Sequence, residues 1–184
     1  MRRLAIVAGL VLAWLAGARA DDAIELAGVR FPAFVDRLAR AEQTDYEARQ
    51  SGLGIAVGYR GANVLATVYI YDKHVQGIPG NPATPIVRKE LDTALDEIQQ
   101  VVRAGRYKAA TVKRRYEIAG PGGLVLYIAA QLTLDQGPQH LDSFVFVTTR
   151  PGKFFKVRYT TTAHDGSVQE AEHFALSWIG GVGR

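Results

Sequence analysis

Four consecutive segments between residues 107 and 162 alternate apolar and polar residues, and they constrain the fold more than any other feature of the sequence. The clearest is Leu124–Asp135, where almost every second residue is a large apolar one. A period of two is that of a β-strand. Short turns rich in Gly and Pro separate the segments, and such turns join antiparallel neighbours. The sequence therefore predicts a four-stranded meander made of Tyr107–Ile118, Leu124–Asp135, Leu141–Thr149 and Phe154–Thr162.

Further strand-like segments precede the meander. Leu53–Arg60 and Asn63–Asp72 alternate in the same way and are predicted to form a hairpin across Gly61 and Ala62. Nearer the N-terminus, Ile24–Phe31 is predicted to be a short strand. Phe34–Tyr46 fits either an irregular strand or a helix, and the strand is the preferred interpretation.

A long amphipathic helix is predicted over Pro85–Ala104. Thr84 is a candidate N-cap, and Pro85 suits the first helical position. Apolar residues recur at spacings of three and four and form one face, which consists of Val87, Leu91, Leu95, Ile98 and Val102. Gly and Pro residues in Gly77–Pro85 predict a loop before this helix.

A second helix is predicted over Val168–Trp178. Ser167 and Glu170 match a capping box at its start, and Gly180 and Gly181 end it. Its apolar side consists of Ala171, Phe174, Ala175 and Trp178. The helix is therefore expected to pack against the sheet through that side.

Several of the predicted strands carry apolar or aromatic residues on both sides. In Asn63–Asp72 one side holds Val64, Ala66, Val68 and Ile70, and the other holds Leu65, Thr67, Tyr69 and Tyr71. A sheet with one face in water alternates more cleanly. The sequence therefore predicts an α+β fold, with a mostly antiparallel sheet of six to eight strands sandwiched by helices. Residues 21–184 are expected to form one domain.

The first 20 residues match a secretory signal peptide. Arg2 and Arg3 are basic, Leu4–Ala16 is apolar, and residues 18–20 fit a small-x-small cleavage site. A membrane anchor is the alternative, but it needs about 20 apolar residues. We therefore expect a mature protein that begins at Asp21, is periplasmic or secreted, and has no transmembrane segment after cleavage.

The composition excludes several classes of function. The chain has no cysteine, which excludes disulfides, thiol catalysis and lipid attachment through a cysteine. It has 22 Lys and Arg against 18 Asp and Glu, but Arg2, Arg3 and Arg19 lie in the signal segment. The remaining net charge of +1 does not favour nucleic acid binding, for which a strongly basic surface is typical.

No segment matches a catalytic motif. The four histidines lack the spacing of metalloproteases, and no serine lies in a GxSxG context. The glycines of Gly120–Gly123 lack the Lys-Ser/Thr of a phosphate loop and are predicted to form a turn. The carboxylates of Asp92, Asp96 and Glu97 are predicted to lie on the exposed side of the first helix. The sequence therefore predicts no enzymatic activity and no cofactor.

Two histidine–aspartate pairs are the candidate for a metal site. His140 with Asp142, and His164 with Asp165, flank turns of the meander and could converge on a metal ion. Solvated turn residues are the alternative, and they are the preferred interpretation because two-residue patterns recur by chance. The sequence therefore predicts no metal.

Two groups of side chains are candidates for a binding site. Lys113 and Arg115 on one predicted strand, with Lys156 and Arg158 on another, could form a basic strip that meets an acidic partner. Tyr69 and Tyr71 could line a partly exposed aromatic cleft. The alternatives are charges that protect a sheet edge and tyrosines that form strands well.

The order of the elements and two local sequences carry a family resemblance. A hairpin with Gly54–Gly58 and Thr67–Asp72 precedes the long helix, the meander and the last helix, and Phe155–Thr160 follows a Pro-Gly turn. In these features, over about Leu26–Trp178, the chain resembles the PsbP-like α/β/α sandwich superfamily. That superfamily consists mostly of non-enzymatic accessory or binding proteins, so the resemblance implies the fold and a non-enzymatic role. No partner-binding motif can be transferred residue by residue.

Three functions remain as expectations. The first is an exported accessory protein of the bacterial envelope that binds a protein partner. The second is a carrier that holds a small apolar or lipid-like ligand between sheet and helix. The third is an enzyme, which the missing motifs favour least.

Overall fold

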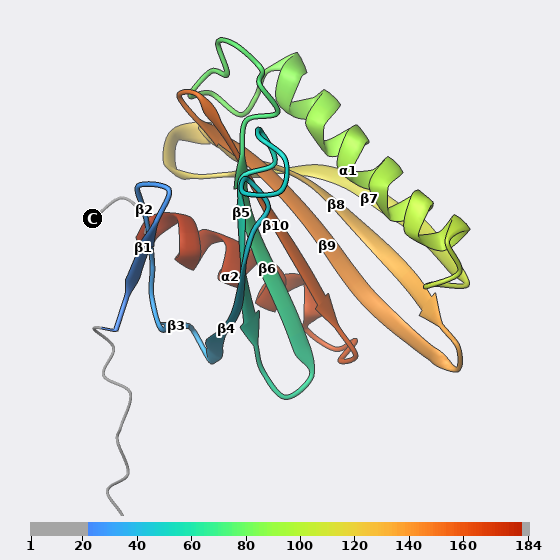
Figure 1. Cartoon of the computed structure of the whole chain (residues 1–184). Coiled ribbons are helices and arrows are strands. Elements are labelled where there is room, and N and C mark those ends of the chain that lie inside the picture. Colours follow the sequence, from blue (N-terminus) through green and yellow to red (C-terminus); the bar gives the residue numbers. More distant parts are fainter. Residues whose placement is uncertain (1–21, 182–184) are drawn as a thin grey trace, which may run out of the picture.

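Eight strands form one antiparallel sheet in the computed structural model, which describes residues 22–181. They are β3 (Phe34–Val35), β4 (Leu38–Asp45), β5 (Ile55–Arg60), β6 (Val64–Tyr71), β7 (Ala109–Ala119), β8 (Val125–Gln136), β9 (Gln139–Arg150) and β10 (Lys153–Thr161). Their order across the sheet is β3-β4-β5-β6-β10-β9-β8-β7 (Figure 1). A separate hairpin consists of β1 (Ile24–Leu26) and β2 (Val29–Phe31).

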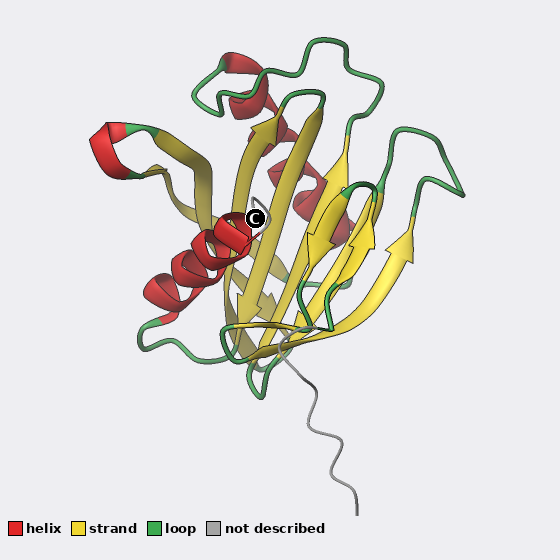
Figure 2. Cartoon of the chain, turned by 90° about the vertical axis from the view of Figure 1, so that its left-hand side faces the viewer, coloured by secondary structure: helices red, strands yellow, loops and turns green. Residues whose placement is uncertain are grey.

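Two helices cover opposite faces of the sheet (Figure 2). Helix α1 (Pro85–Arg103) packs on β7, β8 and β9, and α2 (Ser167–Gly181) packs on β3, β9 and β10. A short 3-10 turn, η1 (Pro121–Gly123), joins β7 to β8. The expected α+β fold, an antiparallel sheet sandwiched by helices, is confirmed.

Strand β9 shows why both faces of the sheet are buried under helices. Phe144 and Phe146 belong to the core under α2, together with Trp178, whereas the alternate residues Val145 and Val147 belong to the core under α1. All five side chains are almost fully buried. Because successive side chains of a strand point to opposite faces, a strand that is apolar at every position must be buried on both sides.

The meander is confirmed, and its last strand returns to the first hairpin. Strands β7 to β10 are neighbours in chain order, and Gly152 in the final turn has φ of +82°, as a type II turn requires. Strand β10 then pairs with β6 along its length, from Phe154 opposite Tyr71 to Thr161 opposite Val64. This non-local pairing places β10 in the middle of the sheet.

The N-terminal segments differ in part from expectation. Ile24–Phe31 is two strands instead of one, because Ala27 and Gly28 both have positive φ and turn the chain between β1 and β2. The segment Phe34–Tyr46 is extended, as preferred over a helix, but Asp36 at φ of +54° divides it into β3 and β4.

Neither predicted helix cap forms as expected. Thr84 occupies the N-cap position of α1 without a side-chain capping bond, and its hydroxyl donates to the carbonyl of Asn81 at 3.2 Å. Ser167 is the first residue of α2, and its hydroxyl donates to Asp142 Oδ2 at 2.7 Å. In both cases the hydroxyl is directed at a nearby carbonyl or carboxylate oxygen, and short polar side chains commonly form such local alternatives to capping.

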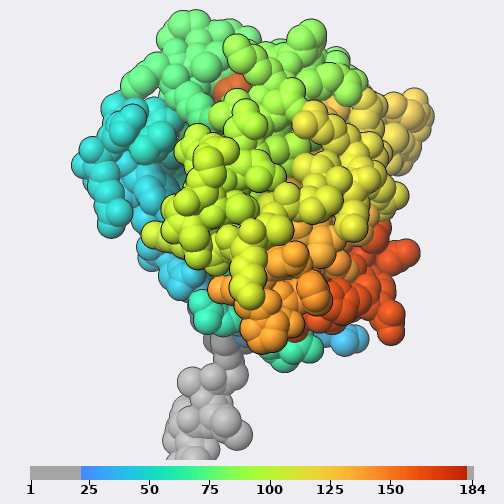
Figure 3. Space-filling model, turned by 90° about the vertical axis from the view of Figure 1, so that its right-hand side faces the viewer, coloured from blue at the N-terminus to red at the C-terminus, as the bar shows by residue number. Residues whose placement is uncertain are grey.

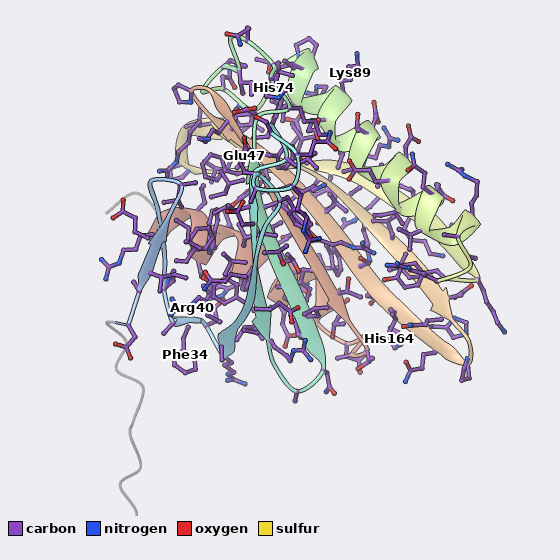
Figure 4. The ribbon with its side chains drawn as sticks, in the orientation of Figure 1. Phe34, Arg40, Glu47, His74, Lys89 and His164 are labelled. Carbon is purple, nitrogen blue, oxygen red and sulfur yellow. The ribbon has the colours of Figure 1, made fainter. Side chains whose placement is uncertain are left out.

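One carboxylate closes the loop between β4 and β5. Glu47 accepts hydrogen bonds from the backbone N–H groups of Gly52 at 2.9 Å and Gly54 at 2.8 Å, and from the Ser51 hydroxyl at 3.0 Å. These bonds lower the pKa of Glu47, with the Gly52 N–H as the largest cause. Figure 4 shows Glu47 and His74 at the same end of the sheet. Glu47 therefore adds side-chain hydrogen bonds to the backbone bonds that already close this loop, among them Tyr46 N–H to the Gly54 carbonyl at 2.9 Å.

Within residues 22–181, no helix is both long enough and apolar enough to cross a membrane. The predicted signal peptide, residues 1–20, lies outside the described residues. So does the predicted mature N-terminus at Asp21. Export therefore stays a prediction from the sequence.

Candidate functional site

Helix α1 leaves part of its own face of the sheet uncovered. It packs on β7, β8 and β9, while β6 and β10 lie beside it. On these two strands the residues that face the α1 side stand in directly opposed pairs. Next to the buried pair of Tyr71 and Phe154, these are Tyr69 with Lys156, Thr67 with Arg158, and Leu65 with Thr160. We call these six residues the open face.

A pocket of about 180 Å³ lies where the open face meets α1. Its lining combines apolar side chains of α1 and β9 with polar side chains of β6, β10 and α1, namely Tyr69, Ala94, Glu97, Ile98, Val101, Val145, Lys156 and Arg158. A wider depression of about 730 Å³ continues from it toward the β5–β6 and β8–β9 turns. Tyr69 and Arg158 line both hollows, so the two form one continuous surface.

Lys156 is already neutralised inside this site. Its Nζ donates to Glu97 Oε2 at 2.9 Å and lies 4.9 Å from the centre of the Tyr69 ring. Glu97 also lies 3.6 Å from Lys73 Nζ, which donates to Glu90 Oε1 at 2.7 Å. Two ammonium groups and two carboxylates thus alternate along the edge of α1, and their charges balance.

Tyr71 belongs to this network and not to the pocket wall. Its hydroxyl donates to Glu90 Oε1 at 2.8 Å, and the residue is only 4% exposed. Burial and the neighbouring Glu90 carboxylate hold the pKa of Tyr71 well above its usual range. The prediction that Tyr69 and Tyr71 share a partly exposed cleft is therefore wrong for Tyr71, since Phe154 of β10 and Ile78 of the loop before α1 pack against it.

Arg158 is the cation of the site without a carboxylate. Its Nη2 donates to the Tyr107 hydroxyl at 3.4 Å, and its guanidinium carbon lies 5.8 Å from the centre of that ring. No carboxylate of residues 22–181 lies within 4.0 Å of the guanidinium nitrogens. The pocket therefore has a net positive charge, located at its Arg158 side.

Lys113 and Arg115 do not join this surface. Strands β9 and β8 lie between β10 and β7, a separation of roughly 14 Å at the usual strand spacing. Arg115 pairs with Asp92 on the far flank of α1, and Lys113 lies at a register shift of β7. Figure 3 shows α1 in yellow-green, with β7 in yellow on one side and the loop near residue 50 in cyan on the other. The predicted four-residue strip is therefore not formed.

The residues that α1 contributes to the pocket were not predicted from the sequence. Glu97 was expected on the exposed side of the helix, but it is half-buried and pairs with Lys156 and Lys73. The spacing of Glu90, Ala94, Glu97 and Val101 places them on one flank of a helix. That spacing could have identified a second, mixed face beside the apolar one.

The histidines and their acidic neighbours separate into two small groups. His140 Nδ1 lies 2.6 Å from Asp135 Oδ1, whereas Asp142 lies 3.5 Å from His164 Nδ1 and accepts the Ser167 hydroxyl. Among residues 22–181, no three His, Cys, Asp or Glu side chains are grouped as metal ligands would be. The two pairs that were candidates for one metal ion, His140 with Asp142 and His164 with Asp165, therefore do not form a single group, because His140 lies against Asp135 and Asp142 lies against His164.

The Glu97 network predicts a pH dependence of stability. Burial raises the pKa of Glu97, but Lys156 and Lys73 outweigh it, so the pKa falls below the ordinary value of 4.5. A carboxyl with a lowered folded-state pKa stabilises the fold above its unfolded pKa and loses that contribution as the pH falls through the folded value. We expect Glu97→Gln to be less stable at pH 7, by at most about 1 kcal/mol because the carboxylate is half-exposed. Urea denaturation at pH 7 and pH 3 measures the difference.

The matched control for this prediction is Asp96→Asn, which neutralises the exposed neighbouring carboxylate. Its free energy of unfolding should follow that of the wild type at both pH values. The Glu97→Gln variant should approach the wild type only at pH 3. An equal difference at both pH values would contradict the assignment of this ion pair to stability.

The chain is similar to a solved structure at low sequence identity. No protein-family model matches the sequence, and a search of curated proteins found no significant match. Among solved structures, the chain is similar to the solution structure of cyanobacterial PsbP (CyanoP) from Synechocystis sp. PCC 6803, with a TM-score of 0.47 and 17% sequence identity. The similarity covers 80% of this chain and 82% of that chain.

Proposed function

We propose that this protein is an exported, non-enzymatic accessory protein of the cell envelope, which binds a protein partner through the open face. The observation that carries the proposal is Arg158, a half-buried cation that has no carboxylate partner among residues 22–181 and lies between a small pocket and a wider groove. Arg and Tyr are enriched at the centres of protein interfaces. The signal-like first 20 residues support export.

The dimensions of the site favour a partner chain over a free lipid. Small-molecule sites usually enclose roughly 300–1,000 Å³, and the apolar pocket has only about 180 Å³. The wider depression has the volume, but Thr, Asn and Gln side chains line much of it. Leu65 at its rim is 42% exposed. A polar groove with one apolar pocket suits a segment of another protein better than an acyl chain.

The proposal is tested by photo-crosslinking in the native host. A photoreactive phenylalanine replaces Leu65 in one variant. In the control it replaces Leu124, which is 62% exposed and directly precedes β8. We expect the Leu65 variant to form one discrete protein adduct that the Leu124 variant lacks. We also expect the intact mass of the exported form to equal that calculated for a chain that begins at Asp21. Equal labelling from both positions, or none, would contradict a partner on the open face. A ligand retained in native mass spectrometry would favour the carrier instead.

A further inference from the structure

We propose that the pocket beside α1 binds the C-terminal residue of a partner peptide, with its carboxylate on Arg158 and its apolar side chain among the α1 residues. This inference rests on the proposed function, because it names what the open face recognises.

The charge of the pocket selects an anion. Lys156 and Glu97 neutralise each other at 2.9 Å, while Arg158 contacts the hydroxyl and ring of Tyr107 and has no carboxylate of residues 22–181 as a partner. A guanidinium that is half-buried beside an aromatic ring is a strong donor to a carboxylate, because its planar N–H groups match the two oxygens. Glu97 would repel an anion placed close to Lys156. The carboxylate is therefore expected at the Arg158 and Tyr107 side of the pocket.

The volume and lining select one apolar side chain. Ala94, Ile98, Val101 and Val145 form the apolar wall of a hollow of about 180 Å³. An apolar cavity of about 150 Å³ admits a benzene-sized group, so this one has room for a single Leu-sized or Phe-sized side chain. It has no room for a long acyl chain.

The two requirements meet in one residue. The guanidinium of Arg158 and the apolar wall line the same small pocket, so the carboxylate and the apolar group must lie a few ångströms apart. The last residue of a peptide has both on one Cα, whereas the carboxylate of an Asp or Glu side chain terminates that side chain. A C-terminal apolar residue therefore fits better than an internal acidic residue.

The wider groove has the chemistry to hold the preceding residues. It continues from Tyr69 and Arg158 along the open face, with hydroxyls of Thr67, Thr160 and Thr162 along its length. Hydroxyl groups both donate and accept hydrogen bonds, as an extended peptide backbone requires. The occupant is thus the end of a chain and not an isolated small molecule.

The test uses the mature protein and three fluorescein-labelled peptides in anisotropy titrations. They are Gly-Ser-Thr-Ser-Leu with a free carboxylate, the same peptide as its C-terminal amide, and Gly-Ser-Thr-Leu-Asp as its amide. We expect the free acid to bind at least about tenfold more tightly than either amide, since a charge-assisted hydrogen bond of this kind is worth that factor. Arg158→Gln should remove the preference for the acid.

Two further variants complete the design. Arg37→Gln removes an exposed guanidinium in the turn between β3 and β4 and should leave binding unchanged. Val101→Phe fills the pocket and keeps Arg158, so it should weaken binding of the free acid even if Arg158→Gln proves unstable. Circular dichroism verifies the fold of each variant.

Several outcomes would overturn the inference while leaving the proposed function intact. One is equal affinity for the acid and its amide, and another is an Arg158→Gln variant that still prefers the acid. Tight binding of the Asp peptide would show that an internal carboxylate is recognised. N-acetyl-leucine that binds as tightly as the peptide would show a small-molecule site. In each case the Leu65 crosslink reports independently on whether a partner occupies the open face.

Discussion

Replacing Leu95 by Asp is expected to prevent the domain from folding. Leu95 is 4% exposed and lies at the centre of the apolar face of α1, in the core against β8 and β9. An unpaired carboxylate in that position costs several kcal/mol of desolvation. Folded domains of this size are stable by roughly 5–15 kcal/mol, so the change removes much or all of the margin. Circular dichroism and urea denaturation of the purified variant measure the loss.

The neighbouring residue provides the control. Asp96 already lies on the exposed side of α1, and Asp96→Ala should change the free energy of unfolding by less than about 0.5 kcal/mol. The two variants alter adjacent positions of one helix, so a difference between them reports which side of α1 is buried. Comparable urea midpoints would mean that the helix packs through another face.

Gly54→Ala should be the second severe change. Gly54 has φ of +64°, and a Cβ added there would stand 1.8 Å from the carbonyl oxygen of Ile70. A backbone oxygen on β6 cannot withdraw without breaking the pairing of β5 with β6. The Gly54 N–H also donates to Glu47, so any shift of this residue opens the loop. We expect a loss of roughly 3–5 kcal/mol in the free energy of unfolding.

Gly77→Ala separates the two causes of that loss. Gly77 has a similar φ of +69°, but a Cβ there would meet no atom within 4 Å. Its replacement should cost only the strain of a left-handed conformation, about 1–2 kcal/mol. Thermal denaturation compares both variants with the wild type. If Gly54→Ala cost no more than Gly77→Ala, the close approach to Ile70 would not matter for stability.

Much of the fold follows from local patterns. Each meander strand was located to within a few residues by its period of two, and α1 was located by its apolar face and its N-terminal proline. The prediction of a sheet covered on both faces also succeeded, because strands such as β9 are apolar at successive positions. These properties depend on neighbours in the sequence, so a single chain is sufficient to reveal them.

The candidate site was predicted only in part. Lys156 and Arg158 do share a face, because they are two residues apart on one strand. Their separation from Lys113 and Arg115 depended on strand order, which no periodicity contains. Glu97 was assigned to solvent because the helical period alone cannot show that β10 places an ammonium group beside it.

The sequence by itself determined the fold class of this protein, through its alternating strands and two amphipathic helices. Only the tertiary structure decided where its charges meet. The pairing of β10 with β6 brings Lys156 to Tyr69, and the docking of α1 on β9 brings Glu97 to Lys156. In the part of the chain that the structure describes, Arg158 has no carboxylate partner. These contacts join residues about 60 to 90 positions apart, and long-range contacts form only when the whole sheet closes.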